Sequence, residues 1–144
     1  MRQDMAQLAK TDGLLVWGSL GKRLEKLSAL VEASETVKLL MTGQLDVFHK
    51  NIPVPERLNA VMAVTDKGVC LYAQMWKNEL TFTKPWGKLE KLSTQTGILA
   101  GLTINLADQG EGYVFRETYR GKVTQSHKLL LEQLKKIYYY KDEE

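Results

Sequence analysis

The side chains best suited to binding chemistry are aromatic and cationic residues between positions 76 and 91. They are Trp76, Lys77, Lys84, Trp86, Lys88 and Lys91. Tryptophan can lie at the level of lipid headgroups while lysine attracts phosphate, and the same residue types also anchor protein interfaces. A structural alternative has the tryptophans cover a sheet edge while the lysines keep that edge from pairing with other chains. The sequence leaves these alternatives open.

Residues that could support catalysis or metal binding are few. The two histidines, His49 and His127, and the lone cysteine, Cys70, are too dispersed for a zinc site of familiar spacing. No nucleophile elbow or triad is recognisable, and the segment GSLGK at 18–22 follows no buried strand and lacks the spacing of a phosphate loop. The sequence therefore predicts no catalytic residues, no metal and no cofactor.

Length and composition favour one globular domain. The chain has 144 residues, of which 44% are hydrophobic and 26% are charged, close to the averages for soluble proteins. Its net charge of +3 comes from lysines interleaved with acidic residues, which argues against a nucleic-acid partner. The first 13 residues are polar where a signal peptide needs an apolar run, and a single cysteine suits a reducing compartment. We therefore expect a cytoplasmic protein.

The elements that must position these side chains are organised around residues 59–76. Two apolar runs flank Thr65-Asp66-Lys67-Gly68, which predicts two buried strands joined by a tight turn with Gly68 at positive φ. Cys70 alternates out of phase with Val69 and Leu71, so we expect it on the opposite face of the sheet, as a small buried hydrophobe.

Further strands are indicated before and after this hairpin. Residues 36–48 predict a long first strand with a bulge or bend at Gly43, and the proline-containing segment 49–58 is expected to run outside the sheet. The remaining strand segments are 79–83, 89–94, the alternation Leu102, Ile104 and Leu106, and 113–119; the segment 89–94 suits a turn of helix equally well. These make about seven strands in a meander.

Three helices are expected at the two ends of the chain. A polar helical extension covers 1–10, and Leu20, Leu24, Leu27 and Val31 form an apolar stripe on a helix over 14–32. A second stripe on Leu130, Leu134 and Ile137 predicts a closing helix that packs on the barrel mouth. We therefore divide one structural unit into an N-terminal extension, 1–32, and a β-barrel with its capping helix, 33–144. One interior should be shared by Leu71, Phe82, Ile104 and Leu130.

The order of these elements, with the motif VMAVTDKGV at 61–69 and WGKLEKL at 86–92 leading to Gly97, resembles the bacterial pleckstrin-homology-like (PH-like) domains. The resemblance is closest to the short YokE-like group of Firmicutes and their phages. It implies a mainly β fold with flanking helices: a partly open seven-stranded barrel capped by a C-terminal helix. Members of this kind resemble binding or assembly modules, and the resemblance brings no catalytic residues.

The same resemblance implies a binding site. In such a fold the loop after the first strand and the turn after the third lie at one open end, which would gather Lys50, Arg57, Trp76 and Lys77. The full basic signature of phosphoinositide-binding members is absent. We therefore expect a non-catalytic module for protein–protein contact or self-association. The alternative is weak peripheral binding of anionic lipid headgroups at a membrane surface, and the third is an enzyme of unrecognised type. The second surface to consider is Lys84, Trp86, Lys88 and Lys91.

Overall fold

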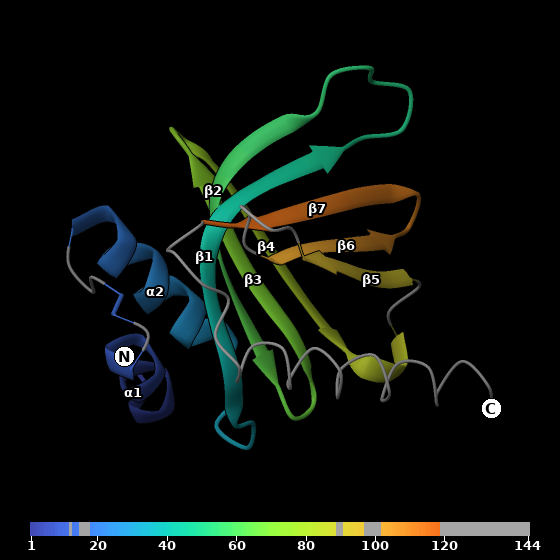
Figure 1. The fold of residues 1–144 in the computed structure, drawn as a ribbon. Coiled ribbons are helices and arrows are strands. Elements are labelled where there is room, and N and C mark those ends of the chain that lie inside the picture. The colour runs from blue at the N-terminus through green and yellow to red at the C-terminus, as the bar shows by residue number, and fades with distance from the viewer. Residues whose placement is uncertain (12, 15–17, 89–90, 97–101, 119–144) are drawn as a thin grey trace.

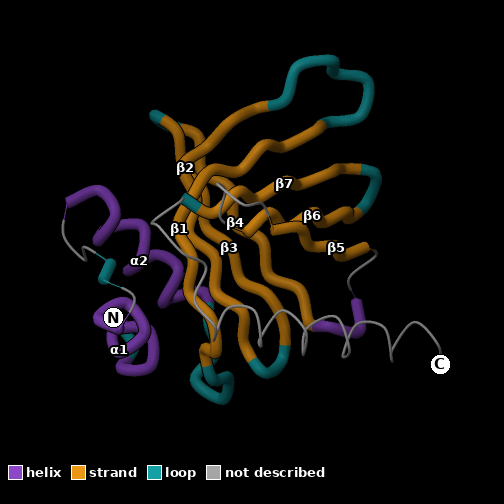
Figure 2. Tube along the Cα trace, viewed as in Figure 1, coloured by secondary structure: helices purple, strands orange, loops and turns teal. Residues whose placement is uncertain are grey.

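The fold is mainly β, with two helices on one side of a curled antiparallel sheet (Figures 1 and 2). The computed structural model describes residues 1–11, 13–14, 18–88, 91–96 and 102–118. The described elements are α1 (Gln3–Thr11), α2 (Gly18–Leu30), β1 (Val37–Phe48), β2 (Glu56–Thr65), β3 (Gly68–Met75), β4 (Asn78–Pro85), the short 3₁₀ helix η1 (Trp86–Lys88), β5 (Lys91–Thr96), β6 (Leu102–Asp108) and β7 (Glu111–Glu117).

The sheet runs in the order β4-β3-β2-β1-β7-β6-β5. It consists of two antiparallel runs, β1 to β4 and β5 to β7, that join where β1 pairs with β7. The expected simple meander is therefore wrong, because β4 and β5 are not neighbours although they follow one another in the chain. The long β1 curves as it passes from one run to the other, and the sheet closes into a half-barrel (Figure 1).

The hairpin of β2 and β3 is confirmed, although its glycine acts differently from the prediction. The hydroxyl of Thr65 accepts hydrogen bonds from the backbone N–H groups of Lys67 (3.1 Å) and Gly68 (3.0 Å), which holds the turn. Gly68 is not among the residues at positive φ. A β-carbon at this position would lie 2.2 Å from the carbonyl oxygen of Lys84 on β4, so the glycine permits close approach of two strands.

Gly43 has a similar role in β1. Of the predicted bulge or bend at this residue, the bulge is wrong, since Gly43 pairs regularly with Ala60 on one side and Glu117 on the other. The register shift in β1 lies between Val37 and Leu39 instead. A β-carbon on Gly43 would lie 1.9 Å from the carbonyl oxygen of Arg116, so only glycine lets β7 approach β1 at this point.

The concave face of the sheet carries the larger core. Leu71, Phe82 and Ile104 all belong to it, as predicted, while Leu130 and the rest of the expected closing helix lie outside the described residues. Phe82 also contacts the ring of Tyr113 at a centroid distance of 5.2 Å. Alternation along β3, β4 and β6 directs these apolar side chains to one shared interior.

The opposite face of the sheet is covered by the two helices. Leu24, Leu27 and Val31 pack with Met5 and Ala9 of α1 onto the sheet residues Val37, Leu40, Val61, Ala63, Cys70 and Tyr72. Cys70 is therefore a buried hydrophobe on the face opposite Leu71, as predicted, and burial raises the pKa of its thiol to about 11. The helix α2 begins at Gly18, later than the predicted residue 14, and Leu14 is not helical.

The loop predicted to run outside the sheet is shorter than expected. Strand β2 already begins at Glu56, and Arg57 pairs in register with Asp46 of β1. Pro53 and Pro55 precede the strand, so they remove no donor from its ladder. Arg57 is therefore a strand residue with a fixed neighbour.

Replacing Gly43 with alanine should destabilise the protein by about 1–3 kcal/mol, because the added methyl group meets backbone atoms that cannot move aside. The matched control is Gly112→Ala on β7, where the new β-carbon would lie 3.7 Å from the β-carbon of Phe48, an ordinary contact. Chemical denaturation should show a lower midpoint for Gly43→Ala and a change within about 0.5 kcal/mol for Gly112→Ala. Equal midpoints for the two variants would contradict the close approach of β1 and β7.

Candidate binding surface

Three turns meet at one end of the sheet. They are the loop between β1 and β2, the turn between β3 and β4, and the turn between β6 and β7, which follow from the antiparallel pairing of these strands. Asn78 donates a side-chain hydrogen bond to Glu56 (3.2 Å), which joins the second turn to the first loop. The β1–β2 loop projects beyond the sheet at the top of Figure 1. The predicted gathering of these segments at one end is therefore present.

This end of the sheet exposes apolar side chains. Among the described residues, four of the five exposed large hydrophobic side chains lie here: Phe48 (41% exposed), Ile52 (55%), Val54 (72%) and Trp76 (89%). Single exposed apolar residues are ordinary, but a group confined to one end of a molecule is typical of an interaction site. We call Phe48, Ile52, Val54 and Trp76, with the neighbouring Lys50 and Lys77, the loop-end surface.

The backbone of these turns is also unusual. In the part of the chain that the structure describes, the residues other than glycine with positive φ are Asn51, Trp76 and Gln109, one in each of the three turns. Asparagine tolerates this region, but a bulky side chain seldom occupies it. Trp76 adopts a φ of 56° while its ring is almost fully in solvent, so neither local conformation nor burial accounts for tryptophan here.

Arg57, a predicted site residue, is held by a carboxylate. Its Nε donates to Asp46 Oδ1 at 2.9 Å, and Arg116 of β7 donates to the other carboxylate oxygen. The Asp46 side chain is only 4% exposed. Hydrogen bonding from Arg57 lowers the pKa of Asp46 despite its burial, and Asp46 raises the pKa of Arg57. Arg57 is thus held against the sheet by a carboxylate that it shares with Arg116.

The remaining predicted cations are less constrained. Lys50 and Lys77 are both exposed, and neither forms an ion pair within the described residues. Carboxylates nevertheless lie close by, since His49 contacts both Glu56 and Glu111. The loop-end surface therefore combines apolar side chains with nearly balanced charge, and no stripe of positive charge forms there.

The second predicted surface is dispersed by the fold. Trp86 is 3% exposed and belongs to the interior core, which agrees with the structural alternative for this residue. Lys84 forms an ion pair with Asp108 at 3.2 Å, and Lys88 is exposed on η1. The structure does not describe the side chain of Lys91. Without an exposed tryptophan, this segment has no aromatic anchor to offer a partner.

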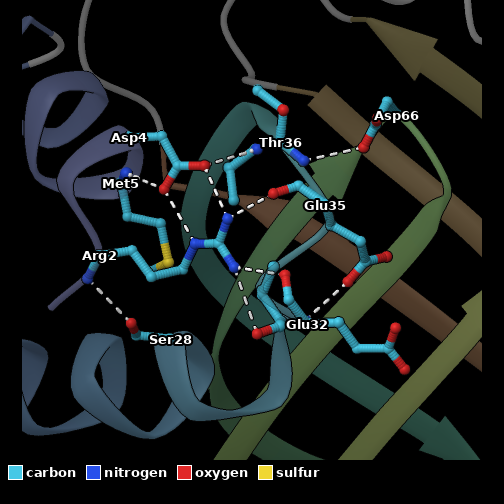
Figure 3. Close-up of polar contacts among 10 residues, drawn as sticks. Arg2, Asp4, Met5, Ser28, Glu32, Glu35, Thr36 and Asp66 are labelled. Atoms are coloured by element: carbon cyan, nitrogen blue, oxygen red, sulfur yellow. Dashed lines mark hydrogen bonds and ion pairs between the residues drawn. The ribbon is translucent and has the colours of Figure 1, made fainter.

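A cluster of charged groups that sequence reasoning missed lies at the N-terminal helix (Figure 3). The Arg2 guanidinium donates to both carboxylate oxygens of Asp4 (3.0 and 3.1 Å) and to the backbone carbonyl oxygens of Val31, Glu32 and Glu35. Asp4 in turn accepts from the Val37 N–H at 2.9 Å. These five bonds use all five N–H donors of Arg2, so the cluster fixes α1 to the sheet and has no donor left for a ligand.

A groove of about 630 Å³ with a mixed polar and apolar lining lies between the start of α2 and the outer face of β1, β2 and β7. Its charged lining residues are Arg23, Arg116 and Glu117. These residues bring charges of both signs to the groove, and Arg116 also contacts Asp46. No sequence signal marks this groove, because its walls come from segments about 90 residues apart.

Other classes of site find little support in the described residues. They contain no group of three or more histidine, cysteine, aspartate or glutamate residues arranged to hold a metal ion. Nor does any helix among them have the length and apolar character needed to cross a membrane. Comparison with models of protein families and with curated proteins finds no match for this chain.

Replacing Asp46 with asparagine should lower the unfolding free energy by about 1–3 kcal/mol at neutral pH, because two arginines lose a charged acceptor. The folded-state pKa of Asp46 is lowered, so its contribution is present above the unfolded value of about 3.9 and is lost as pH falls through the folded value. The difference between parent and variant should therefore shrink in acid.

Urea denaturation between neutral pH and about pH 2.5 measures this difference. The matched control is Glu25→Gln, which removes an exposed carboxylate on α2 and should change stability by less than about 1 kcal/mol. If the unfolding free energy of Asp46→Asn stays below that of the parent by the same amount at every pH, the ionised carboxylate of Asp46 is not the source of the difference.

Proposed function

We propose that this chain is a PH-like, non-catalytic binding module that recognises a protein surface through its loop end, with a second copy of the chain as the first partner to consider. One observation carries the proposal: four of the five exposed large hydrophobic side chains of the described residues lie on two adjoining connections, the β1–β2 loop with the end of β1 and the β3–β4 turn, with Trp76 at 89% exposure. Tryptophan is the residue type most enriched among side chains that dominate interface energies. Excluding water from these four side chains supplies the driving force.

The balance of charge favours a protein over a lipid surface. Anionic membranes attract segments with several unpaired lysines or arginines, each contributing about 1 kcal/mol. At the loop end Arg57 is paired with Asp46, and Glu56 and Glu111 flank His49. A surface with an apolar centre and mixed charges at its rim has the composition of a protein interface.

The PH-like assignment rests on the curled sheet and its central hairpin. A curled half-barrel in which β1 connects two antiparallel runs supports the expected partly open barrel, although the strands do not follow the expected meander. The hairpin motif VMAVTDKGV stands at the turn between β2 and β3, as the resemblance requires. A fold of this kind hosts many functions, so the binding proposal depends on the loop-end surface itself.

Trp76→Ala should weaken self-association at least about 30-fold, since hot-spot tryptophans contribute about 2 kcal/mol or more and 1.4 kcal/mol is a factor of ten. Sedimentation equilibrium over a range of protein concentrations measures the dissociation constant. The control is Lys88→Ala, an exposed residue away from the loop end that should change the constant less than about threefold. A parent protein that stays monomeric up to about 1 mM would refute self-association.

A second candidate, weak binding to anionic lipid, is favoured by one observation: Lys50 and Lys77 flank the apolar residues without an ion pair in the described structure. Changing both lysines to glutamate should abolish sedimentation with phosphatidylserine vesicles, as should raising the salt concentration. Arg57 is left unchanged, because glutamate there would face Asp46 and unfold the strand pair.

The matched control for this experiment changes Lys22 and Lys26, exposed on α2, to glutamate. It alters the net charge by the same amount at a distance from the loop end. Equal losses in the two double variants would assign any lipid binding to overall charge, and vesicle binding that survives Lys50→Glu with Lys77→Glu would exclude this surface as the lipid site.

A further inference from the structure

His49 lies at the end of β1 with both of its ring nitrogens directed at carboxylates. Nε2 is 3.3 Å from Glu56 Oε2 on β2, and Nδ1 is 3.4 Å from Glu111 Oε1 on β7. A neutral imidazole has one N–H and one lone pair, so it can donate to only one of two acceptors. Only the protonated ring can donate to both carboxylates, so the arrangement favours the charged form of His49.

The groups that face this histidine come from two strands. Glu56 contributes from β2, and Glu111 contributes from β7, where it also accepts a hydrogen bond from the Tyr113 hydroxyl at 2.9 Å. The hydrogen bonds to Glu56 and then Glu111 raise the pKa of His49 above its usual value, while those from Tyr113 and His49 lower the pKa of Glu111. Burial, with the acidic neighbours Glu111 and Asp108, raises the pKa of Tyr113 to about 12, so the phenol stays protonated.

These contacts connect the three turns at this end of the sheet. His49 joins the β1–β2 loop to the β6–β7 turn through Glu111, and Glu56 joins the same loop to the β3–β4 turn through Asn78. The loop segment between His49 and Glu56 carries Ile52 and Val54, two of the exposed apolar residues. The His49–Glu56 contact therefore adds a side-chain link to the backbone pairing of Val47 with Glu56, where the loop begins and ends.

We propose that His49 is a pH-sensitive latch: when protonated it fixes the β1–β2 loop against β7 and preassembles the loop-end surface, and when neutral it releases the loop. The regulatory part of this inference rests on the function proposed above, because a preordered surface loses less conformational entropy on binding its partner. The direction of the pH dependence follows from the raised pKa of His49. The latch is complete below the ordinary value of about 6.5 and is lost as pH rises through the higher folded value.

Proton NMR of the His49 ring tests the latch in the full chain without any partner. The sequence has two histidines, so His49→Gln identifies the resonance. We expect His49 in the parent to titrate above pH 6.5, and Glu56→Gln and Glu111→Gln each to shift its midpoint downward. The control is Glu79→Gln, which removes an exposed carboxylate on β4 at the same end of the sheet as His49. This variant should leave the midpoint unchanged. A parent midpoint at the ordinary value, unaffected by both glutamine variants, would overturn the latch.

The mobility of the β1–β2 loop provides a second test of the latch. Relaxation of the Ile52 methyl group should report greater mobility as pH rises through the His49 midpoint, whereas His49→Gln should be mobile at every pH. Mobility that does not change through the titration would refute control of the loop, even if the pKa is raised.

Repeating the self-association measurement at pH 5.5 and pH 8.5 then separates the two proposals. We expect the dissociation constant of the parent to rise at least threefold at the higher pH, with no change for His49→Gln. A pH-independent constant would refute regulation while the latch and the interface stand. Absence of association at both pH values would refute the proposed partner while the NMR titration still decides the latch.

Discussion

The approach of β7 to β1 at Gly43 is the contact on which the sheet depends. Strand β1 pairs with β2 along its length and with β7 over its second half, so it is the only described strand shared by the two antiparallel runs. A side chain at Gly43 would overlap the backbone of Arg116 and push the runs apart. Their separation would open the concave core, in which residues of β1 to β4 pack against Ile104, Leu106 and Phe115.

Each face of the sheet carries an apolar core, and the outer face becomes polar near the turns. Residues of β2 and β3 alternate between the concave core, represented by Leu71, and the helix-covered core, represented by Cys70. Near the turns, the outer face becomes polar and carries Asp46 between Arg57 and Arg116. These ion pairs keep that end of the sheet aligned without helical cover.

The loop-end surface therefore combines ordered charges with exposed apolar groups. The neighbouring carboxylates Asp46 and Glu56 already contact Arg57 and His49, which leaves the apolar side chains as the main source of binding free energy. A tryptophan at positive φ raises the conformational free energy of the turn, and a partner that buries the Trp76 ring would explain its presence there. The His49 contacts link the order of this surface to proton concentration.

Local periodicity was enough to predict the hairpin of β2 and β3, the stripe Leu24, Leu27 and Val31, and the burial of Cys70, because each pattern repeats within a few residues. The expectation that Lys50 and Trp76 lie at one end came from the resemblance to a known fold and not from periodicity. The burial of Trp86, the pairing of Arg57 with Asp46 and Arg116, and the reason for glycine at positions 43 and 68 could not be read in this way. Each depends on strands that meet only after the sheet has curled, and contacts between residues up to 70 positions apart leave no periodic signal in a single sequence.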